Sequence, residues 1–141
     1  MVDMPVFSAG TSDPDLEKLV SEGLAAFNAA VLPSDDETPL SVRATAEDGT
    51  LIGGVTGFTW GGCGSIMSFW LSPQYRGQGL GRQLLTAAES EIRRRGCDRV
   101  VLATMSFQAP GFYLHHGYEQ VGVTPGMPHG TAKHHFHKRL A

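Results

Sequence analysis

The sequence predicts a single domain of the α+β (mixed α/β) class, built on a mixed β-sheet. Three observations predict it: apolar segments of strand length recur along the chain, segments with helical apolar spacing lie between them, and glycine-rich turns separate the two kinds. A chain of 141 residues is long enough to bury a substantial core as one domain over residues 1–141.

The first expected elements are a short strand at Val6 and Phe7 and a helix. The helix begins after Asp13, a good N-cap, with Pro14 in its first turn, and it ends near Pro33. Its apolar face is expected to consist of Leu16, Leu19, Val20, Leu24 and Phe27.

Three strands are expected next. Residues 40–46 and 51–60 predict two strands joined by the turn EDGT, which is typical of a hairpin. A glycine-rich turn at 61–64 leads into a buried strand over residues 65–71.

A second helix is expected to end at Gly96, and a strand over residues 99–105 follows it. The apolar face of this helix is expected to consist of Leu80, Leu84, Leu85, Ala88 and Ile92.

The last part of the chain predicts one short helix and two strands. The helix covers residues 109–116, and the strands cover residues 118–123 and 133–140. Residues 124–130 contain two prolines and two glycines, which predicts a loop.

The segment PQYRGQGLGRQLL, residues 73–85, places three glycines at alternate positions between two arginines. Glycines permit tight turns and leave main-chain N–H groups free to converge on an anion. Because the segment joins a predicted strand to a predicted helix, the helix dipole also favours negative charge there. The segment therefore predicts a phosphate site, and a turn that only reverses the chain is the alternative.

Two common phosphate loops do not match this segment. A Walker A loop ends in G-K-S/T, whereas Gly81 is followed by Arg82 and Gln83. A dinucleotide fingerprint needs G-x-G-x-x-G and an acidic residue after the next strand. Here the spacing is G-x-G-x-G, and the strand over 99–105 ends without a carboxylate.

Composition excludes several classes of protein. Hydrophobic residues make up 41% of the chain and charged residues 18%, which is ordinary for a soluble globular protein. No apolar run approaches the roughly 20 residues of a membrane span, and the first residues lack the pattern of a signal peptide, so a cytoplasmic protein without membrane contact is expected. The sequence contains no basic stripe with interleaved aromatic residues, so nucleic-acid binding is not predicted. Cys63 and Cys97 lie in unlike contexts, which predicts two thiols rather than a disulfide.

The net charge of −3 is unevenly divided. Residues 1–50 contain ten acidic and two basic residues, whereas residues 51–141 contain four acidic and nine basic residues. The basic part suits an anionic ligand and the acidic part a cationic one, with chance surface charge as the alternative.

Two segments resemble motifs of the GNAT superfamily of N-acetyltransferases. SFWLSPQYRGQGLGRQLL is similar to its acetyl-CoA pyrophosphate motif, because Arg76, Gly79 and Gly81 meet the pattern Q/R-x-x-G-x-G/A. APGFYLHHGYEQVG, residues 109–122, resembles its A-x-x-F-Y-x-x-x-G-F segment, with Tyr113 at the place of the tyrosine. The resemblance covers about half of the chain. It implies a central, mostly antiparallel sheet of six to seven strands, flanked by about four helices and splayed between the fourth and fifth strands.

The resemblance implies that the amides of residues 77–82 bind the pyrophosphate of coenzyme A and that Arg76 adds positive charge. It also implies that the strand ending at Leu71 pairs with the pantetheine arm, with a nearby N–H polarising the thioester carbonyl. The family often has asparagine where this chain has Ser106, so a polar contact to the pantetheine is expected to differ. The implied acetyl-CoA-binding residues are Phe69, Trp70, Leu71, Arg76, Gly77, Gln78, Gly79, Leu80, Gly81, Arg82 and Ser106.

By the same resemblance, Tyr113 lies beside the coenzyme sulfur and protonates the departing thiolate as a general acid. A core aromatic residue is the alternative, because Phe112 and Tyr113 are neighbours on a short helix and one of them must point inward.

Acceptor-binding candidates come from two segments. The attacking amine must lose a proton, which requires a base or a water chain to one. Asp36 and Glu37 follow the first helix, and His134 and His135 belong to the last strand, where His135 and His137 would share one face. Capping or solvation is the alternative for each, and no second cluster completes a metal site.

The resemblance implies transfer of an acetyl group from acetyl-CoA to an amine by direct attack in a ternary complex. The acidic amino-terminal part indicates a small, cationic amine metabolite or antibiotic as the acceptor, and a homodimer is compatible with the sequence. A protein lysine or amino terminus is the alternative acceptor. A coenzyme A-binding sensor without turnover is a further alternative, disfavoured by the presence of the loop glycines and Tyr113.

Overall fold

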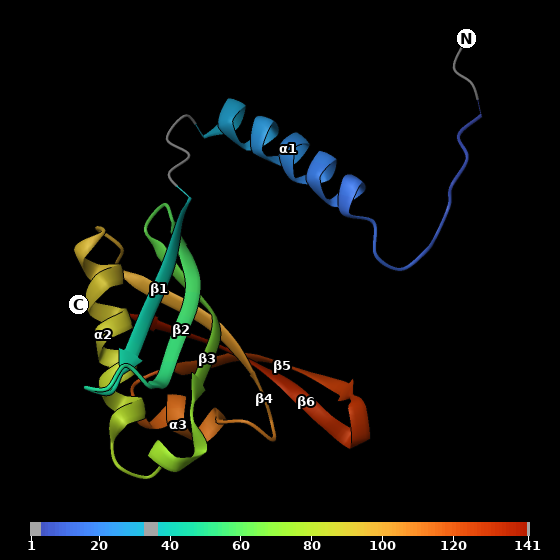
Figure 1. Cartoon of the computed structure of the whole chain (residues 1–141). Coiled ribbons are helices and arrows are strands. Elements are labelled where there is room, and N and C mark those ends of the chain that lie inside the picture. Colours follow the sequence, from blue (N-terminus) through green and yellow to red (C-terminus); the bar gives the residue numbers. More distant parts are fainter. Residues whose placement is uncertain (1–3, 33–36, 141) are drawn as a thin grey trace. The chain divides into compact units, whose positions relative to one another are not determined.

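The computed structural model describes residues 4–32 and 37–140. The chain divides into two compact units, residues 1–35 and residues 36–141 (Figure 1).

The first unit contains helix α1, Pro14–Val31, as predicted. The carboxylate of Asp13 caps the helix and accepts a hydrogen bond from the main-chain N–H of Leu16 at 3.1 Å. No side chain of α1 is buried. The predicted strand at Val6 and Phe7 is wrong: both side chains are exposed and the segment has no regular structure. No strand of the described sheet pairs with this segment.

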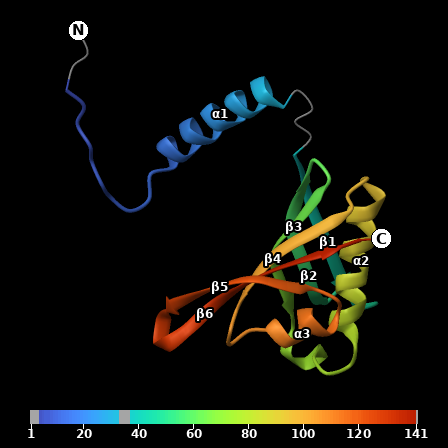
Figure 2. The same ribbon diagram turned by 180° about the vertical axis from the view of Figure 1, so that it is seen from behind.

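The second unit is built on a six-stranded sheet with the strand order β1-β2-β3-β4-β6-β5 (Figures 1 and 2). Every neighbouring pair is antiparallel except β3 and β4, which are parallel. The sheet is therefore mixed and mostly antiparallel, as predicted. The strands are β1 Thr38–Thr45, β2 Leu51–Trp60, β3 Cys63–Leu71, β4 Arg99–Met105, β5 Glu119–Met127 and β6 Thr131–Arg139. The helices are α2 Leu80–Arg94 and α3 Pro110–His115, with short 3-10 turns at Pro73–Tyr75 and Pro128–Gly130.

The predicted loop over residues 124–130 is partly wrong, because Thr124–Met127 belongs to β5. A register shift between Thr124 and Met127 accommodates Pro125 and Gly126. Pro125 cannot donate a main-chain hydrogen bond, and it is tolerated because β5 is an edge strand of the sheet.

The core lies between one face of the sheet and the helices α2 and α3. Along β4, alternate residues Val100, Leu102 and Thr104 are buried on this face. Gly64 of β3 lies directly beneath α2, since a Cβ atom there would approach Ile92 Cδ1 to 2.6 Å. From α2, the core includes Leu84, Leu85, Ala88 and Ile92, and from the rest of this face it includes Leu40, Val55, Ile66, Tyr113, Tyr118 and Phe136.

The β3–β4 pairing ends early. It runs from Cys63↔Arg99 to Ile66↔Leu102, although the strands continue to Leu71 and Met105. Beyond Ile66, β3 stays paired with β2, and beyond Leu102, β4 stays paired with β6. The sheet therefore splits between the two segments for which a splay was predicted. The prediction counted these segments as the fourth and fifth strands, because it included a first strand at Val6 and Phe7. That strand is not formed, so the segments are the third and fourth strands, β3 and β4.

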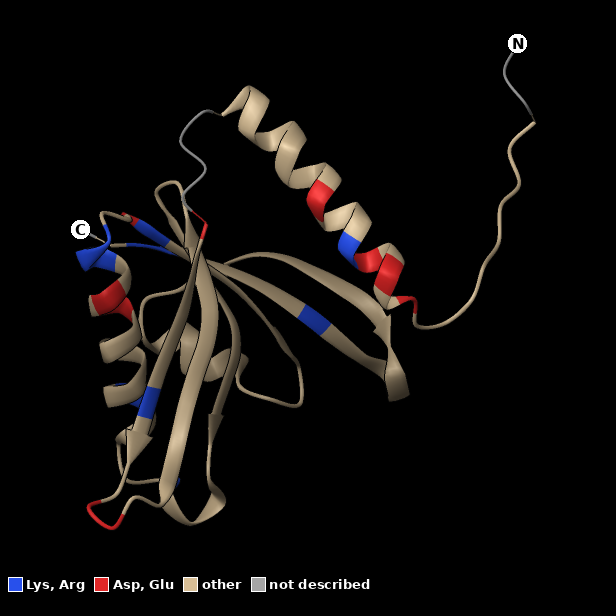
Figure 3. Ribbon diagram, turned by 45° about the horizontal axis from the view of Figure 1, so that its top comes forward, with Lys and Arg blue, Asp and Glu red and all other residues tan. Residues whose placement is uncertain are grey.

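Charged side chains of α2, and of Arg95 directly after it, form hydrogen bonds with the sheet. Figure 3 shows basic residues at the carboxyl end of this helix. Arg95 donates to Glu91 at 2.9 Å and to the main-chain carbonyl of Pro39 at 2.9 Å. Nearer the middle of the helix, the partly buried Glu89 accepts from Tyr118 Oη at 2.7 Å and from Lys138 Nζ at 3.0 Å. None of the helices in the described residues is long and apolar enough to cross a membrane.

Replacing Glu89 by alanine is expected to lower the free energy of unfolding by about 3 kcal/mol, because Lys138 would remain partly buried without its partner. Denaturant unfolding measures this change. Glu119→Ala is the control, since that carboxylate side chain is 81% exposed, and it should stay within about 0.5 kcal/mol of wild type. Equal losses in the two variants would contradict a structural role for the Glu89 contacts.

Candidate active site

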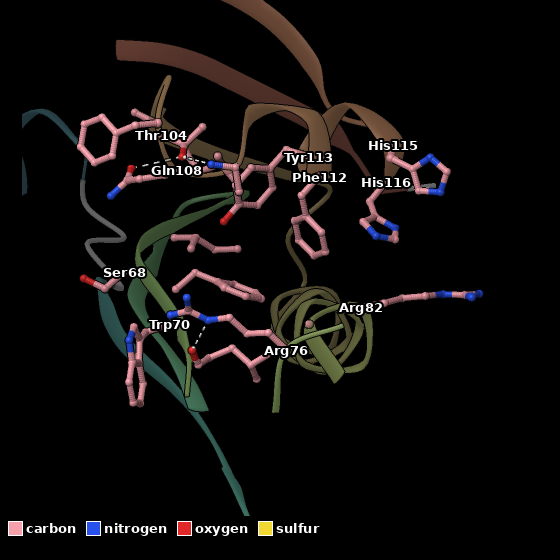
Figure 4. A pocket seen from close by; sticks show the side chains of 18 of the residues that line it. Ser68, Trp70, Arg76, Arg82, Thr104, Gln108, Phe112, Tyr113, His115 and His116 are labelled. Atoms are coloured by element: carbon pink, nitrogen blue, oxygen red, sulfur yellow. Dashed lines mark hydrogen bonds between the residues drawn. The ribbon is translucent and has the colours of Figure 1, made fainter. Parts of the chain in front are cut away.

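A first cavity of about 910 Å³ opens where β3 and β4 separate, on the face that α2 and α3 cover (Figure 4). Four segments line it: the end of β3, the glycine-rich segment, the end of β4, and α3 with the residues before it. Of the residues expected to bind acetyl-CoA, the lining includes Phe69, Trp70, Leu71, Arg76, Gly77, Gly79, Gly81 and Arg82. Gln78, Leu80 and Ser106 are not in the lining.

The glycine-rich segment leaves space for a ligand at its main chain. Gly77 and Gly79 have φ angles of 76° and 81°, in the left-handed region, and a Cβ atom at either residue would meet no heavy atom within 4 Å. The first hydrogen bond of α2 joins Gln83 N–H to the Gly79 carbonyl. The N–H groups of residues 80–82 therefore lie at the open, positive end of α2.

Arg76 connects this segment to the end of β3. Its Nε donates to the main-chain carbonyl of Leu71 at 2.8 Å, shown as a dashed line in Figure 4. The guanidinium has five N–H donors, and only Nε–H is bonded by a described residue. Together with Arg82, Arg76 adds positive charge to the lining of the cavity.

Tyr113 has its ring in the core and its hydroxyl at the first cavity. The residue is 5% exposed, and in Figure 4 its hydroxyl points into the cavity. Burial raises the pKa of Tyr113 to about 12, so the hydroxyl stays protonated at neutral pH. No described residue forms a hydrogen bond with this hydroxyl. Its ring contacts Phe69, Phe112, Tyr118 and Phe136.

Sequence reasoning missed the polar pair at the turn between β4 and α3. Gln108 Oε1 accepts from the N–H of Met105 at 2.7 Å and from Thr104 Oγ1 at 3.2 Å. These bonds fix the end of β4, and both Thr104 and Gln108 line the cavity. No motif distinguished these residues in the sequence.

Ser106, where a polar contact to the pantetheine is expected to differ from the family pattern, forms hydrogen bonds with β6. Its Oγ accepts from the N–H of Ala132 at 3.0 Å, and its own N–H donates to the Ala132 carbonyl at 2.8 Å. The hydroxyl therefore joins the end of β4 to β6.

A second cavity, of about 690 Å³, is lined mainly by side chains on the other face of the sheet, together with core residues next to the split. On β4 these are Val101 and Ala103, which alternate with the buried residues of the core. From β6, Lys133, His135 and His137 contribute. The two cavities share the lining residues Ile66, Met67, Leu102, Ala103, Thr104 and Gln108, so they meet at the split between β3 and β4.

The family model described as the acetyltransferase (GNAT) family matches residues 11–118. The chain belongs to the GNAT family. A GNAT protein of this kind is an N-acetyltransferase that uses acetyl-CoA.

Three relatives illustrate this membership. Blasticidin-S acetyltransferase of Streptomyces morookaense is 36% identical over 77% of this chain and 82% of its own. An acetyltransferase of Agrobacterium fabrum is 29% identical over 86% of this chain and 88% of its own. The crystal structure of a Bacillus cereus acetyltransferase covers 95% of this chain and 98% of its own, with a TM-score of 0.84 and 30% identity.

The first cavity fits the coenzyme of a GNAT enzyme. Its open glycine main chain, the positive end of α2 and two arginines suit a pyrophosphate. From Met67 to Leu71, β3 has no β4 partner, so that edge can form main-chain hydrogen bonds with an extended ligand.

Two further histidines line the first cavity and were also missed. His115 and His116 follow Tyr113 in the motif FYLHHG, where two adjacent imidazoles could have been noticed. Partial burial, and then the nearby charges of His115 and Arg82, lower the pKa of His116.

The candidates for acceptor binding separate in the structure. His135 lines the second cavity, with its Nε2 at 3.2 Å from Thr124 Oγ1. His134 lies on the opposite face of β6, with its Nδ1 at 2.7 Å from Gln120 Oε1. Glu37 directly precedes β1 and lines neither cavity.

Asp36 lies outside the described residues. Within the described parts of the chain, no group of three His, Cys, Asp or Glu side chains is placed to bind a metal ion.

Proposed function

We propose that this GNAT enzyme binds acetyl-CoA in the first cavity and a small amine in the second, and that the amine attacks the thioester directly. The observation that supports this most strongly is the meeting of the two cavities at the β3–β4 split. Two substrates that enter from opposite faces of the sheet can be bound at the same time, and their reacting groups can meet there.

Residues of the chain bind and orient the coenzyme. The N–H groups of residues 77–82, with Arg76 and Arg82, bind the pyrophosphate. The free edge of β3 pairs with the extended arm. One N–H of this edge polarises the thioester carbonyl. Since Met67 lines both cavities, this N–H lies nearer to Met67 than to Leu71.

Acetyl-CoA supplies the acetyl group as a thioester. Tyr113 donates its hydroxyl proton toward the sulfur as the C–S bond breaks. An ordinary thiol, with a pKa of about 8.5, is a stronger acid than this phenol. Tyr113 therefore assists chiefly by a hydrogen bond that strengthens as negative charge develops on the sulfur.

A small acceptor agrees with the size of the second cavity, which is typical of small-molecule pockets. The relative from Streptomyces morookaense, 36% identical, is named for acetylation of blasticidin S, a small molecule. Cysteine-based covalent transfer finds no support, because neither Cys63 nor Cys97 lines either cavity.

An amine panel tests the proposal. The enzyme is mixed with acetyl-CoA and small amines, free thiol is measured, and acetylated products are identified by mass spectrometry. We expect release of one thiol for each acetamide formed. Binding of acetyl-CoA without transfer to any amine would instead indicate a sensor, and transfer only to protein lysines or amino termini would contradict the small acceptor.

A further inference from the structure

We infer that the second cavity selects acceptor amines that also carry an anionic oxygen group, a carboxylate or a phosphate, and that Lys133 binds this group. The inference rests on the proposed function, since it concerns the acceptor of the same reaction.

Lys133 belongs to the lining of the second cavity and not of the first. On β6 it shares a face with His135 and His137, which also line the second cavity. From Gln120 to His137 it is the only lysine, arginine, aspartate or glutamate.

The main chain of Lys133 is fixed on both sides. β6 lies between β4 and β5, and Lys133 pairs with Met105 on one side and Thr124 on the other. The ammonium is therefore presented from an interior strand of the sheet. Its position varies only through the flexible side chain.

Within the second unit, Lys133 is the only lysine or arginine among the described residues that line the cavity. No aspartate or glutamate is among its lining residues. In the described parts of the chain, no ion pair involves Lys133, whereas Lys138 and Arg95 pair with glutamates at 3.0 Å and 2.9 Å. An anion in the cavity would give Lys133 the partner that these other cations already have.

Apolar side chains also favour binding of the acceptor. Met67, Val101 and Val121 contribute exposed apolar surface to the lining, which the carbon chain of an acceptor can cover while its anionic group pairs with Lys133. The polar contacts of His135 and His137 are made with Thr124 and Glu119. Lys133 is thus the best placed cation for the ligand.

The strand geometry sets the distance between Lys133 and the split. Pairing of β3 with β4 ends at Leu102, and Lys133 pairs with Met105, three residues farther along β4. Three strand residues span about 10 Å. The main chain of Lys133 therefore lies about 10 Å from the split along the strands, and the flexible lysine side chain adjusts the distance at which an anionic group is bound.

The acidic first part of the chain indicated a cationic acceptor, yet its described carboxylates in the second unit, Glu37, Glu47 and Asp48, do not line this cavity. The amine itself is cationic before it loses its proton. A zwitterionic acceptor therefore satisfies the chemistry of the lining residues better than a polycation.

A matched acceptor series tests the inference with the full-length enzyme and acetyl-CoA. Linear primary amines of equal length carry at the far end a carboxylate, a phosphate, a neutral amide or a second amine. We expect kcat/KM for at least one anionic acceptor to exceed that for the amide at least tenfold, chiefly through KM. Lys133→Gln should bring this ratio close to one, and Lys133→Arg should largely retain it.

Arg139→Gln is the control, because Arg139 is an exposed cation on the same face of β6 that does not line the second cavity. It should leave the ratio unchanged. If neutral or dicationic acceptors react as well as the anionic ones, the inferred selection for anionic acceptors is overturned. The proposed acetyl transfer would still hold. Acetyl-CoA binding without acetylation of any member would contradict the proposed transfer, and the inference with it.

Discussion

Replacement of Tyr113 by phenylalanine is expected to lower kcat by about 100-fold or more, because the hydrogen bond to the departing sulfur is lost. The ring keeps its core contacts with Phe136 and Tyr118. No described residue bonds the hydroxyl, so the free energy of unfolding should change by less than about 0.5 kcal/mol. Affinity for acetyl-CoA should change little. Steady-state kinetics, calorimetric titration and denaturant unfolding separate these three quantities.

Tyr118→Phe is the matched control. Tyr118 is also a buried tyrosine, but its hydroxyl donates to Glu89 and it lines neither cavity. This variant should lose stability and keep kcat. Unchanged kcat in Tyr113→Phe, or equal losses of kcat in the two variants, would remove Tyr113 from the proposed role.

The pH dependence follows from the raised pKa of Tyr113. Its acid form is the active one and persists until the pH approaches about 12. Between about pH 7 and 10, the rate should therefore rise as the amine loses its proton, without a descending limb due to Tyr113.

Gly79→Ala is expected to weaken acetyl-CoA binding by about 10- to 100-fold, the equivalent of one lost charge-assisted hydrogen bond of about 1.5–3 kcal/mol. The new methyl group would project into open space at the cavity and not into protein. The left-handed conformation also costs about 1 kcal/mol of stability with alanine. Calorimetric titration measures the affinity and thermal unfolding measures the stability.

Gly49→Ala separates these two effects. Gly49 has a φ angle of 88°, similar open space, and a place in the β1–β2 turn away from both cavities. It should lose similar stability without losing affinity. If Gly49→Ala lost as much affinity for acetyl-CoA as Gly79→Ala, backbone strain would explain the loss, and the main chain of Gly79 would have no specific role in binding the pyrophosphate.

Local signals in the sequence predicted most of the fold. Asp13 and Pro14 define the start of α1, and the bounds of β2 and β4 agree with their apolar patterns. The prediction of a strand at Val6 and Phe7 was wrong because a strand also needs a partner strand, which the local sequence does not specify. The strand residues Thr124–Met127 were predicted as a loop because proline is disfavoured within a strand. Pro125 is tolerated here because β5 is an edge strand with a register shift at this point.

The site was predictable only where a motif marks it. The glycine segment and Tyr113 were found, and the structure brings both to one cavity. Lys133 and Gln108 have no local signature, because their places at the second cavity depend on the pairing of β6 with β4 and on the turn that follows β4. The hydrogen bond of Ser106 was not predictable, because its hydroxyl accepts from a strand residue 26 positions away in sequence.

The central claim is that acetyl-CoA and the amine meet at the β3–β4 split and react directly. Its most direct test is an initial-rate measurement in which the concentrations of acetyl-CoA and an accepted amine are varied together. Direct attack in a ternary complex predicts reciprocal plots that intersect, and no acetylated enzyme by mass spectrometry when the amine is withheld. Parallel plots together with an acetylated protein side chain that passes its acetyl group to the amine would contradict it.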